Sequence, residues 1–559
     1  MTSRLGLDRR GRLGTCGLLA AIAILASSAL GAEAKGKPPM PPLPPREAAI
    51  AGIAAHLETA DPFHIVRPGE EAKARFTIAN SQSAPAKVRL EVEIESWEGD
   101  KVSRNADLDV PAGATVFWPL PKDALGALGH KTLRYHVTVG GEVSSDAEQM
   151  LVYLTPTGRA AQHGPGTLFG LAFGAGRDNT DENSALVADW LGLDIVRLHL
   201  PWSHMEPKPG EFQWDDVDKV IGQYEAHGIQ IQALFSGTPA WALKDKEAGA
   251  AARERGEKTE SRAPDPQAWE TFTGQYAARF RGRVAYYEIW NEPDLEFWTG
   301  TDDEYLELLR GAYRAIKAAD PRAVVMTGGF AGGGQTDRLK PAILERTLTE
   351  ARDSFDVIAY HRHGFFKDFA KEIQEKLLSL RERTGNAAKP LYFTETAMDS
   401  RKGLRHQAET LVKKISFTSS LGAIAHTWFN LHDASTGSLK SGYSYGLLSS
   451  DGEPKTSFAA YNTLTGLLRG KTPMARLATA EGVWALPFQG EKETIVVCWR
   501  EDDKAPAELR LQTDARGAET VDIMGNAKPL ALSSQSVALT LSSTPVYVRL
   551  QGASRVAMQ

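Results

Sequence analysis

The sequence predicts a (β/α)8 barrel flanked by an N-terminal and a C-terminal β-sandwich domain. Two observations support this fold class. Short apolar runs alternate with amphipathic helical segments through residues 166–470, and alternation of apolar and polar residues fills a stretch on either side. The chain has 559 residues, which is long enough for several domains. We therefore expect an α/β domain in the middle and all-β domains at both ends.

The barrel is predicted from eight apolar runs with helical segments between them. Eight strand–helix units over about 300 residues are typical of this fold. An open doubly wound sheet is the alternative, but no glycine-rich phosphate loop follows the first run. One helix is expected over 304–319, where Thr301 and Glu304 have capping-box spacing. The runs lie near residues 167–173, 194–200, 229–235, 284–290, 323–328, 356–361, 390–394 and 423–428.

The segments on either side of residues 166–470 have different residue patterns. Residues 63–155 alternate with turn signals between the runs, as in a sandwich of immunoglobulin size, and residues 472–552 predict a smaller sandwich. Residues 35–62 are expected to form a proline-rich linker and a short alanine-rich helix over 46–60. The charged stretch 243–263 is expected to be a solvated surface loop, or else a flap beside the substrate groove.

Residues 1–34 have the pattern of an export signal. Arg9, Arg10 and Arg12 precede an apolar run over 16–30, and Ala32-Glu33-Ala34 follows as a cleavage pattern. We expect a periplasmic or extracellular protein. Its only remaining cysteine would be Cys498, so no internal disulfide could form.

Composition excludes some classes of partner. The chain is 42% hydrophobic and 24% charged with a formal net charge of −6, and it has no basic stripe for nucleic acid or anionic lipid. No segment after the signal is long and apolar enough to span a membrane. A neutral or weakly charged partner fits better, and nothing in the sequence specifies an oligomeric state.

Candidate catalytic residues lie at strand ends, where barrels carry their active sites. In 284–292, alternation places Glu288, Trp290 and Glu292 on one face. In 390–395 it places Phe393 and Glu395 on one face. Glu292 and Glu395 should therefore meet at one rim. Glycosidic bond cleavage needs two such carboxyl groups, one protonated and one ionised. The alternative for either glutamate alone is an ordinary ion pair at the rim.

Two motifs resemble a known family. Trp290-Asn291-Glu292-Pro293 resembles the acid/base signature of glycoside hydrolase clan A, and Phe393-Thr394-Glu395 resembles the nucleophile strand of that clan. Together with 196–218, 264–280 and 445–464, they make residues 166–470 most similar to family 39, with family 5 next. Family 39 and its relatives include β-xylosidases, α-L-iduronidases and endoglycosidases of bacterial exopolysaccharides.

The resemblance implies roles for particular residues and no cofactor. Glu292 would be the general acid/base and Glu395 the nucleophile of a retaining enzyme. Asn291 would bind the sugar 2-hydroxyl, and Arg197 would lie under the nucleophile and favour its ionised form. Alternation within 194–200 also directs Arg197 towards the lumen. Glu288 is expected to be an interior ion-pair partner of Arg197.

Further substrate contacts are expected from histidine and tryptophan. His361 and His363 share one strand face, and His363 stands where the clan often has tyrosine. A metal site is the alternative, but no third ligand suggests itself and we expect none. The tryptophans at or just after strand ends could stack on sugars or pack in the core. These are Trp202, Trp241, Trp298 and Trp428.

The function predicted from these residues is a retaining O-glycoside hydrolase with a carbohydrate substrate. A sandwich before the barrel suits anchoring on a long polymer, which favours endo action on a polysaccharide. An exo-acting β-xylosidase-like enzyme is one alternative. A non-catalytic carbohydrate-binding or matrix protein on a glycosidase scaffold is another, because fold alone does not decide function.

Overall fold

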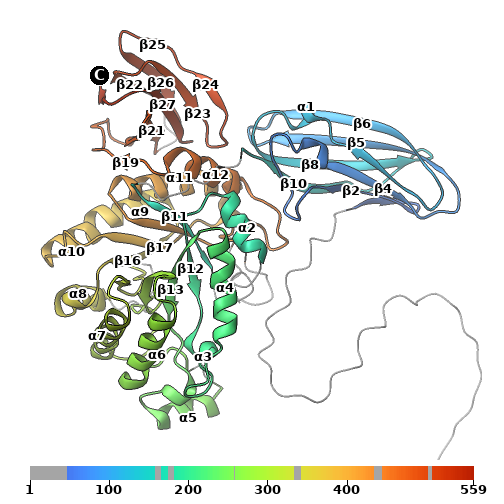
Figure 1. The fold of residues 1–559 in the computed structure, drawn as a ribbon. Helices are drawn as coiled ribbons and strands as arrows, with labels where there is room; N and C mark the ends of the chain where they lie inside the picture. The colour runs from blue at the N-terminus through green and yellow to red at the C-terminus, as the bar shows by residue number, and fades with distance from the viewer. Residues whose placement is uncertain are drawn as a thin grey trace, which may run out of the picture. The chain divides into compact units, whose positions relative to one another are not determined.

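The computed structural model describes residues 47–155, 157, 165–173, 182–256, 259–332, 341–433, 444–501 and 506–559 (Figure 1). The expected export signal and proline-rich segment 35–45 lie outside the described residues. No helix in the described ranges is long and apolar enough to cross a membrane.

The N-terminal domain is a β-sandwich of mostly antiparallel strands (Figure 1). One sheet has the order β1-β2-β4-β7, and the other has the order β3-β10-β8-β5-β6 with β9 beside β8. Alternate residues of the strands face a shared core. The strands are β1 (Ala48–Ile50), β2 (Ile53–Glu58), β3 (Ile65–Val66), β4 (Arg75–Asn80), β5 (Ala86–Ser96), β6 (Lys101–Val110), β7 (Thr115–Pro119), β8 (Gly129–Val139), β9 (Glu142–Val143) and β10 (Ala147–Tyr153), with the short helix α1 (Lys122–Leu125).

The helix expected over 46–60 was wrong, because this segment is a β-hairpin. Ile50 pairs with Ile53 across a turn formed by Ala51 and Gly52, both with positive φ. A two-residue turn of this kind matches the twist of the strands that it joins. The alanine content favours helix, but burial of every second residue in β2 adds more apolar contact with the sandwich core. The sandwich therefore begins at Ala48.

The middle domain contains the eight strands that the apolar runs predicted. They form one parallel sheet in the order β15-β14-β13-β12-β11-β18-β17-β16. Parallel bridges from Met326 to Val357 and from Phe330 to Tyr360 join its two ends. The strands are β11 (Leu168–Phe173), β12 (Ile195–His199), β13 (Gln230–Phe235), β14 (Val284–Ile289), β15 (Val324–Met326), β16 (Ile358–His363), β17 (Leu391–Ala397) and β18 (Ala425–Phe429).

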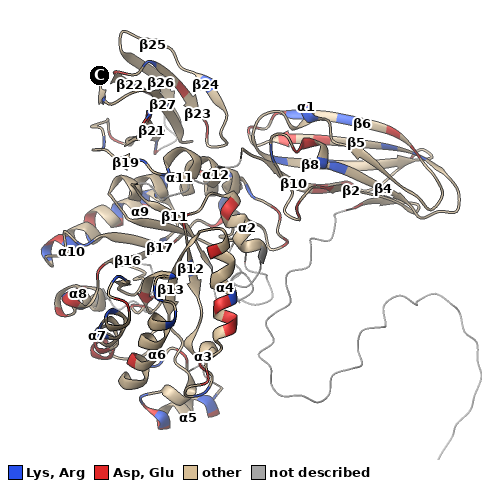
Figure 2. Cartoon of the chain, in the orientation of Figure 1, with Lys and Arg blue, Asp and Glu red and all other residues tan. Residues whose placement is uncertain are grey.

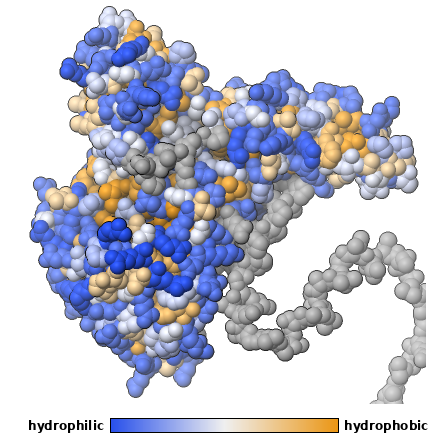
Figure 3. Space-filling view, in the orientation of Figure 1, coloured by the Kyte–Doolittle hydropathy of each residue, from blue (hydrophilic) through white to orange (hydrophobic). Residues whose placement is uncertain are grey.

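Helices cover the outside of this barrel (Figure 1). The view in Figure 3 shows a mostly hydrophilic barrel surface, since the apolar side chains are packed between helices and sheet. The helices are α2 (Glu182–Trp190), α3 (Trp202–Met205), α4 (Trp214–Ala226), α5 (Lys246–Glu254), α6 (Pro266–Arg279), α7 (Asp302–Ala319), α8 (Pro341–Glu350), α9 (Phe366–Glu372), α10 (Leu378–Arg383), α11 (Leu404–Ser420) and α12 (Thr456–Leu468).

Local signals explain where two of these helices begin. The capping box predicted for α7 is present, with Thr301 and Glu304 bonding each other's backbone N–H groups. The charged stretch 243–263 is not all loop, because α5 forms inside it. The Asp245 side chain caps this helix by accepting a hydrogen bond from the N–H of Ala248.

The C-terminal domain is a second sandwich with its own apolar core. Its sheets have the orders β19-β20-β21-β27-β23-β24 and β25-β26-β22-β28. Cys498 is buried in β21 as a free thiol. The strands are β19 (Thr472–Pro473), β20 (Val483–Gln489), β21 (Glu493–Arg500), β22 (Ala507–Thr513), β23 (Gly517–Val521), β24 (Ala527–Pro529), β25 (Leu532–Ser533), β26 (Ser536–Leu541), β27 (Val546–Gln551) and β28 (Val556–Met558).

Candidate active site

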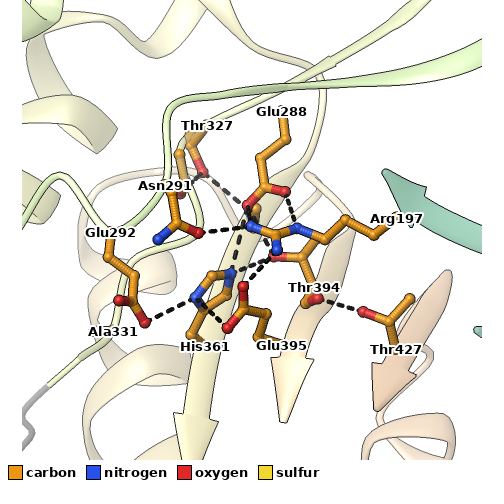
Figure 4. A network of polar contacts seen from close by, with 12 residues as sticks. Arg197, Glu288, Asn291, Glu292, Thr327, Ala331, His361, Thr394, Glu395 and Thr427 are labelled. Carbon is orange, nitrogen blue, oxygen red and sulfur yellow. Dashed lines mark hydrogen bonds and ion pairs between the residues drawn. The ribbon is translucent and has the colours of Figure 1, made fainter. Parts of the chain in front are cut away.

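Arg197 lies at the centre of a polar cluster inside the barrel (Figure 4). It is buried on β12, where alternation directs it inwards as predicted. Its Nε donates to Oε2 of Glu288 at 2.6 Å, and its Nη2 donates to Oδ1 of Asn291 at 2.8 Å. Its Nη1 donates to Glu395. One guanidinium thus ties together side chains that follow or belong to β14 and β17.

Glu288 is the interior partner of Arg197 that the sequence predicted. Its carboxylate also accepts hydrogen bonds from Gln232 Nε2 at 2.5 Å and Thr394 Oγ1 at 3.0 Å. Burial alone would raise the pKa of this carboxyl. The charge of Arg197 and the hydrogen bond from His361 outweigh burial and lower the pKa to about 2. Glu288 is therefore ionised at any ordinary working pH.

His361 is the second cation of the cluster. Its Nδ1 lies 3.0 Å from Oε1 of Glu292, and its Nε2 lies 2.9 Å from Oγ1 of Thr394. Burial lowers the pKa of this imidazole, but the negative charge of Glu395 and hydrogen bonds to Glu288 and Glu292 raise it to about 9. His361 is thus a buried imidazolium at neutral pH, and its 1% exposure leaves no surface for a sugar. Its predicted substrate contact is replaced by contact with the acidic groups.

Glu292 and Glu395 meet at the rim, as the strand ends predicted. One carboxyl oxygen of each lies within 4.8 Å of the other, and a ring nitrogen of His363 lies within the same distance of both. Burial and the negative charges of Glu292 and Glu288 raise the pKa of Glu395 above its usual value, although the charges of Arg197 and His361 act in the opposite direction. The two carboxyl groups therefore face one small space with unequal surroundings.

Acidic side chains outnumber cations in the cluster. Arg197 and His361 face the carboxyl groups of Glu288, Glu292 and Glu395. An uncompensated charge in a buried site is unfavourable, so these side chains depend on one another.

Glu292 reaches this position through a break in strand regularity. Trp290 and Glu292 both have positive φ, at 80° and 42°. Such backbone is rare for residues other than glycine and costs about 1–3 kcal/mol per residue. The N–H of Trp290 bonds the carbonyl of Phe235 at 2.9 Å, and the N–H of Glu292 bonds the carbonyl of Gly329 at 3.1 Å. These contacts hold the strained turn.

Two side-chain directions expected from simple alternation were therefore wrong. The Trp290 ring does not face the lumen but packs against Trp269 of α6 and Trp298. Phe393 packs against Phe369 of α9, away from the face of Glu395. In β17 the pairing register shifts between Phe393 and Thr396, which is a bulge that lets Glu395 turn inwards.

Gly329 and Asp294 belong to the site but were missed from the sequence. A Cβ on Gly329 would overlap Nε2 of His361 and Oε1 of Glu288, so only glycine fits there. The Gly328-Gly329 pair after β15 was an available signal. The Asp294 carboxylate accepts hydrogen bonds from the N–H groups of Ala331 and Gly332 at 3.0 and 3.1 Å. Burial raises its pKa to about 6.

The four tryptophans predicted as sugar platforms mostly pack in the core. Trp202, Trp298 and Trp428 are at most 1% exposed. Trp202 stacks on Phe272, and the three indole N–H groups donate to Glu206, Thr301 and Tyr445. Because a platform must expose its ring face, these three predictions were wrong. Trp241 is partly exposed and donates to the carbonyl of Glu206, so its prediction stands.

His363 borders the space between the two glutamates. Its Nε2 lies 3.8 Å from Oε2 of Glu395, and 31% of its side chain is exposed. Glu292, His363 and Glu395 have the geometry of a possible metal site, which supplies the third ligand that the sequence did not suggest. However, Arg197 already pairs with Glu395 and His361 with Glu292. A metal ion there would compete with two fixed positive charges.

The barrel also matches a known family. Residues 159–435, just under half of the chain, match the family model described as Cellulase (glycosyl hydrolase family 5). The barrel is therefore similar in sequence to glycoside hydrolases of clan A. The matched residues 159–435 include all the residues of the cluster that surrounds Arg197.

Solved structures share the fold of this glycoside hydrolase domain. A family 39 glycoside hydrolase from the gut symbiont Bacteroides cellulosilyticus WH2 is 19% identical with a TM-score of 0.68, over 89% of this chain and 100% of that chain. A GH30 endoxylanase from Clostridium papyrosolvens C71 is 16% identical with a TM-score of 0.50, over 71% of this chain and 98% of that chain. At these identities the likeness concerns fold.

Two curated relatives are more similar in part of their sequence. A β-xylosidase from Caldicellulosiruptor saccharolyticus is 25% identical over 240 residues, covering 38% of this chain and 48% of that protein. An endo-1,4-β-xylanase C from Paenibacillus barcinonensis is 22% identical over 235 residues, covering 36% of this chain and 21% of that protein. The chain thus spans about half the length of the first relative and about a fifth of the second.

Proposed function

We propose that this protein is a retaining O-glycoside hydrolase, with Glu292 as general acid/base and Glu395 as nucleophile. The observation that carries the proposal is the separation of the two carboxyl groups, which approach within 4.8 Å. Carboxyl groups are about 5–5.5 Å apart in retaining glycosidases and about 6.5–9.5 Å apart in inverting ones. The shorter spacing leaves no room for a water molecule between the inverting base and the sugar.

The two glutamates divide the reaction into two displacements. An ionised Glu395 attacks the anomeric carbon while Glu292 gives its proton to the leaving glycosidic oxygen. The resulting glycosyl ester is cleaved by water, whose proton returns to Glu292 as Glu395 leaves. No cofactor enters this sequence. The pairing of Glu395 with Arg197 and its approach to His361 support an ionised nucleophile.

Arg197 and Asn291 prepare the site for the developing charge. Arg197 donates to Glu395 and so favours the ionised nucleophile. It also engages Oδ1 of Asn291. This orients the amide so that its N–H groups are left for a sugar hydroxyl, a contact that tightens in the transition state.

The substrate we propose is a polysaccharide cut internally. The two sandwich domains offer surface on which a long chain could be anchored. One curated relative is named an endo-1,4-β-xylanase and the other a β-xylosidase, so β-linked xylosyl compounds are the first substrates to test. Sizing the products from a xylan and from a panel of bacterial exopolysaccharides separates endo from exo action. Release of monosaccharide alone would replace the endo proposal with the exo-acting alternative.

The glutamate roles are tested by chemical rescue on an activated aryl glycoside. Glu395→Gly should lose at least about 10³-fold in kcat and regain turnover with azide, which enters the space left by the carboxylate. Glu292→Gln should lose more activity on substrates with poor leaving groups. Glu296→Gln is the matched control, because Glu296 is an exposed glutamate four residues along the same loop. Full activity of Glu395→Gly without azide would remove Glu395 from the mechanism.

Product stereochemistry tests retention directly. Proton NMR of the first sugar released should show the same anomeric configuration as the substrate. Inversion would contradict double displacement even if both glutamates proved essential. Absence of hydrolysis on every glycan, combined with measurable binding, would favour the non-catalytic carbohydrate-binding alternative.

We also propose that residues 1–34 direct export. The proposal rests on the basic start, the apolar run and the cleavage pattern alone. Fractionation of the producing cells, with sequencing of the mature N-terminus, should find the protein outside the cytoplasm and starting near residue 35. A cytoplasmic protein that retains residues 1–34 would contradict it.

A further inference from the structure

Glu292 stands on a strained turn that lies against the loop after β15, residues 328–332. Its φ of 42° is a backbone conformation that persists only where the surrounding structure holds it. The N–H of Glu292 bonds the carbonyl of Gly329 at 3.1 Å, and Asn291 forms a parallel bridge with the same glycine. What holds the loop, and what fastens the turn to it, therefore determine where the Glu292 carboxyl points.

The loop is held at its start and in its middle by other parts of the barrel. Tyr305 of α7 accepts a hydrogen bond from the N–H of Gly328 at 2.8 Å and donates its own hydroxyl to the carbonyl of Ile289 at 3.2 Å. The carbonyl of Phe330 accepts a hydrogen bond from the N–H of His361 at 2.7 Å. The loop is thus anchored to α7, β14 and β16.

The end of the loop is packed against a buried pair of side chains. Gly332 has a φ of 68°, and a Cβ on it would overlap Oη of Tyr360 and Oε1 of Glu372. The Tyr360 hydroxyl donates to Glu372 at 2.8 Å, and both residues are at most 5% exposed. Because the backbone at Gly332 has no room to move towards this pair, a group bonded to its N–H is itself held in place.

Asp294, two residues after Glu292, fastens the turn to this loop. It is 2% exposed, and its two carboxylate oxygens accept hydrogen bonds from the N–H groups of Ala331 and Gly332 at 3.0 and 3.1 Å. Hydrogen bonds to an ionised acceptor are shorter and stronger than those between neutral groups. One carboxylate thus joins the turn to two successive peptide groups of a fixed loop.

We propose that Asp294 is a positioning residue that fastens the strained turn and so directs the Glu292 carboxyl at the leaving oxygen. The N–H of Glu292 is one attachment of the turn to the loop, and the Asp294 carboxylate is a second. Without the second attachment, the strained backbone relaxes and the carboxyl moves away from the oxygen that it protonates. The proposal rests on the assignment of Glu292 as general acid/base, and Asp294 acts through backbone geometry without transferring a proton.

The leaving group of the substrate distinguishes this role from a general loss of structure. A dinitrophenolate departs with little help from an acid, whereas a phenol or a sugar needs the proton of Glu292. In Asp294→Ala, kcat/KM should fall about 10- to 100-fold on a phenyl glycoside or an oligosaccharide and no more than about 3-fold on the dinitrophenyl glycoside, since a misplacement of about 1 Å costs on the order of 100-fold in rate. Asp294→Asn keeps one acceptor oxygen and should show the same pattern with a smaller loss.

Asp320→Ala is the matched control. Asp320 is also 2% exposed and accepts hydrogen bonds from two backbone N–H groups, those of Gly282 and Arg322, at 3.2 and 3.1 Å. The exposed Arg281 lies 4.0 Å from it. Asp320 follows α7 and precedes β15, so it lies at the end of the barrel opposite to the active site. Its removal should lower the unfolding midpoint and change kcat/KM by the same factor on both kinds of substrate.

Hydrogen exchange tests the attachment without any substrate. Peptides that span residues 328–332 should exchange faster in Asp294→Ala than in wild type, because two N–H groups lose their acceptor. Peptides from β11 and β18 should exchange as in wild type, which shows that the barrel is folded.

Unchanged exchange at residues 328–332 would overturn the proposal, and so would an equal fall of kcat/KM on both kinds of substrate. The same leaving-group dependence in Asp320→Ala would also contradict it. If the wild type hydrolyses no glycoside, the exchange data still decide whether Asp294 holds the turn, and the failure lies with the proposed function.

Discussion

One arginine held between two glutamates is found in two very different settings in this molecule. On the N-terminal sandwich, Arg134 of β8 pairs with Glu95 of β5 at 2.7 Å and with Glu148 of β10 at 2.8 Å. All three side chains are between 31% and 42% exposed. Figure 2 shows β5, β6 and β8 carrying basic and acidic residues side by side.

Inside the barrel, Arg197 of β12 pairs with Glu288 of β14 and Glu395 of β17. Arg197 and Glu288 are almost completely excluded from water. The residue types are the same as on the sandwich, but the sandwich pairs join neighbouring strands and the barrel pairs join strands that are not neighbours in the sheet. The barrel group is also buried. Water screens the exposed pairs, so each contributes little. Removing one partner from the buried group leaves an uncompensated charge in a medium of low dielectric constant.

The comparison indicates that an ion pair matters most where water cannot hydrate the charge left behind when one partner is removed. The surface triplet can separate and be hydrated at small cost. The buried triplet fixes the position and protonation of its members, because each depends on the others. Four substitutions test this difference. Three change the buried cluster, and one changes the exposed group on the sandwich.

Arg197→Met should have the largest effect. It leaves Glu288 and Glu395 without their cation, and breaking a buried pair costs about 3–5 kcal/mol. Thermal unfolding should show a large drop in the midpoint, and hydrolysis should fall below detection. Glu288→Gln keeps the shape and tests the same contact if Arg197→Met does not fold. A midpoint within 2 °C of wild type, a margin that corresponds to about 1 kcal/mol, would show that the cluster is not energetically coupled.

His361→Gln should remove a pH dependence of stability worth roughly 3 kcal/mol. The pKa of His361 is about 9 when folded, above its usual value near 6.5. Its contribution is therefore fully present below pH 6.5 and is lost as pH rises to about 9. Glu288 behaves in the opposite sense, since its pKa of about 2 makes its contribution present above pH 4.5 and lost below it.

The measurement is the unfolding midpoint of wild type and His361→Gln between pH 5 and pH 9.5. The wild-type midpoint should fall through the alkaline half of this range, and that of the variant should change much less. Parallel curves for the two proteins would mean that His361 is neutral in the folded state. The assignment of His361 as the second cation of the cluster would then be wrong.

Gly329→Ala should cost about 1–3 kcal/mol, the usual range for overpacking a rigid interior. The added methyl group would overlap His361 and Glu288, so activity should fall together with stability. Gly222→Ala in α4 is the matched control, because nothing lies within 4 Å of the Cβ that it would add. That change should be neutral or slightly stabilising, as alanine is the better helix former. Equal midpoints for the two variants would contradict close packing at Gly329.

Arg134→Met should have the smallest effect. Its glutamate partners on the sandwich surface, Glu93, Glu95 and Glu148, become hydrated, and the unfolding midpoint should move by no more than about 2 °C. Half-molar salt should reduce even this difference, because exposed pairs are screened within about 10 Å at much lower ionic strength. A shift as large as that of Arg197→Met would remove the distinction between the two settings.

Much of the barrel and the meeting of the two glutamates could be predicted from the sequence. All eight apolar runs became strands, and Arg197 and Glu288 paired as expected. These predictions depended on the spacing of apolar residues and on the positions of charged residues, which can be taken directly from the sequence. Glu292 and Glu395 could be singled out because each lies in a short motif that resembles a known family.

Other features could not be predicted, because they depend on backbone irregularity or on distant partners. Positive φ at Trp290 and the bulge before Thr396 reversed the expected faces of Trp290 and Phe393. All four tryptophans satisfy their N–H groups inside the fold, and three of them are buried, which composition does not reveal. The hairpin at Ala51-Gly52 had an alanine-rich sequence typical of a helix. In each case tertiary contacts outweighed a local preference.

Gly329 also bears on how related sequences should be interpreted. A chain that keeps both glutamates but has a larger residue here could not bring His361 between Glu292 and Glu288. It would retain both sequence motifs and lose the arrangement of the acidic side chains around His361. The glycine that follows the fifth strand is therefore as informative as either glutamate when a catalytic barrel must be told apart from one that only binds.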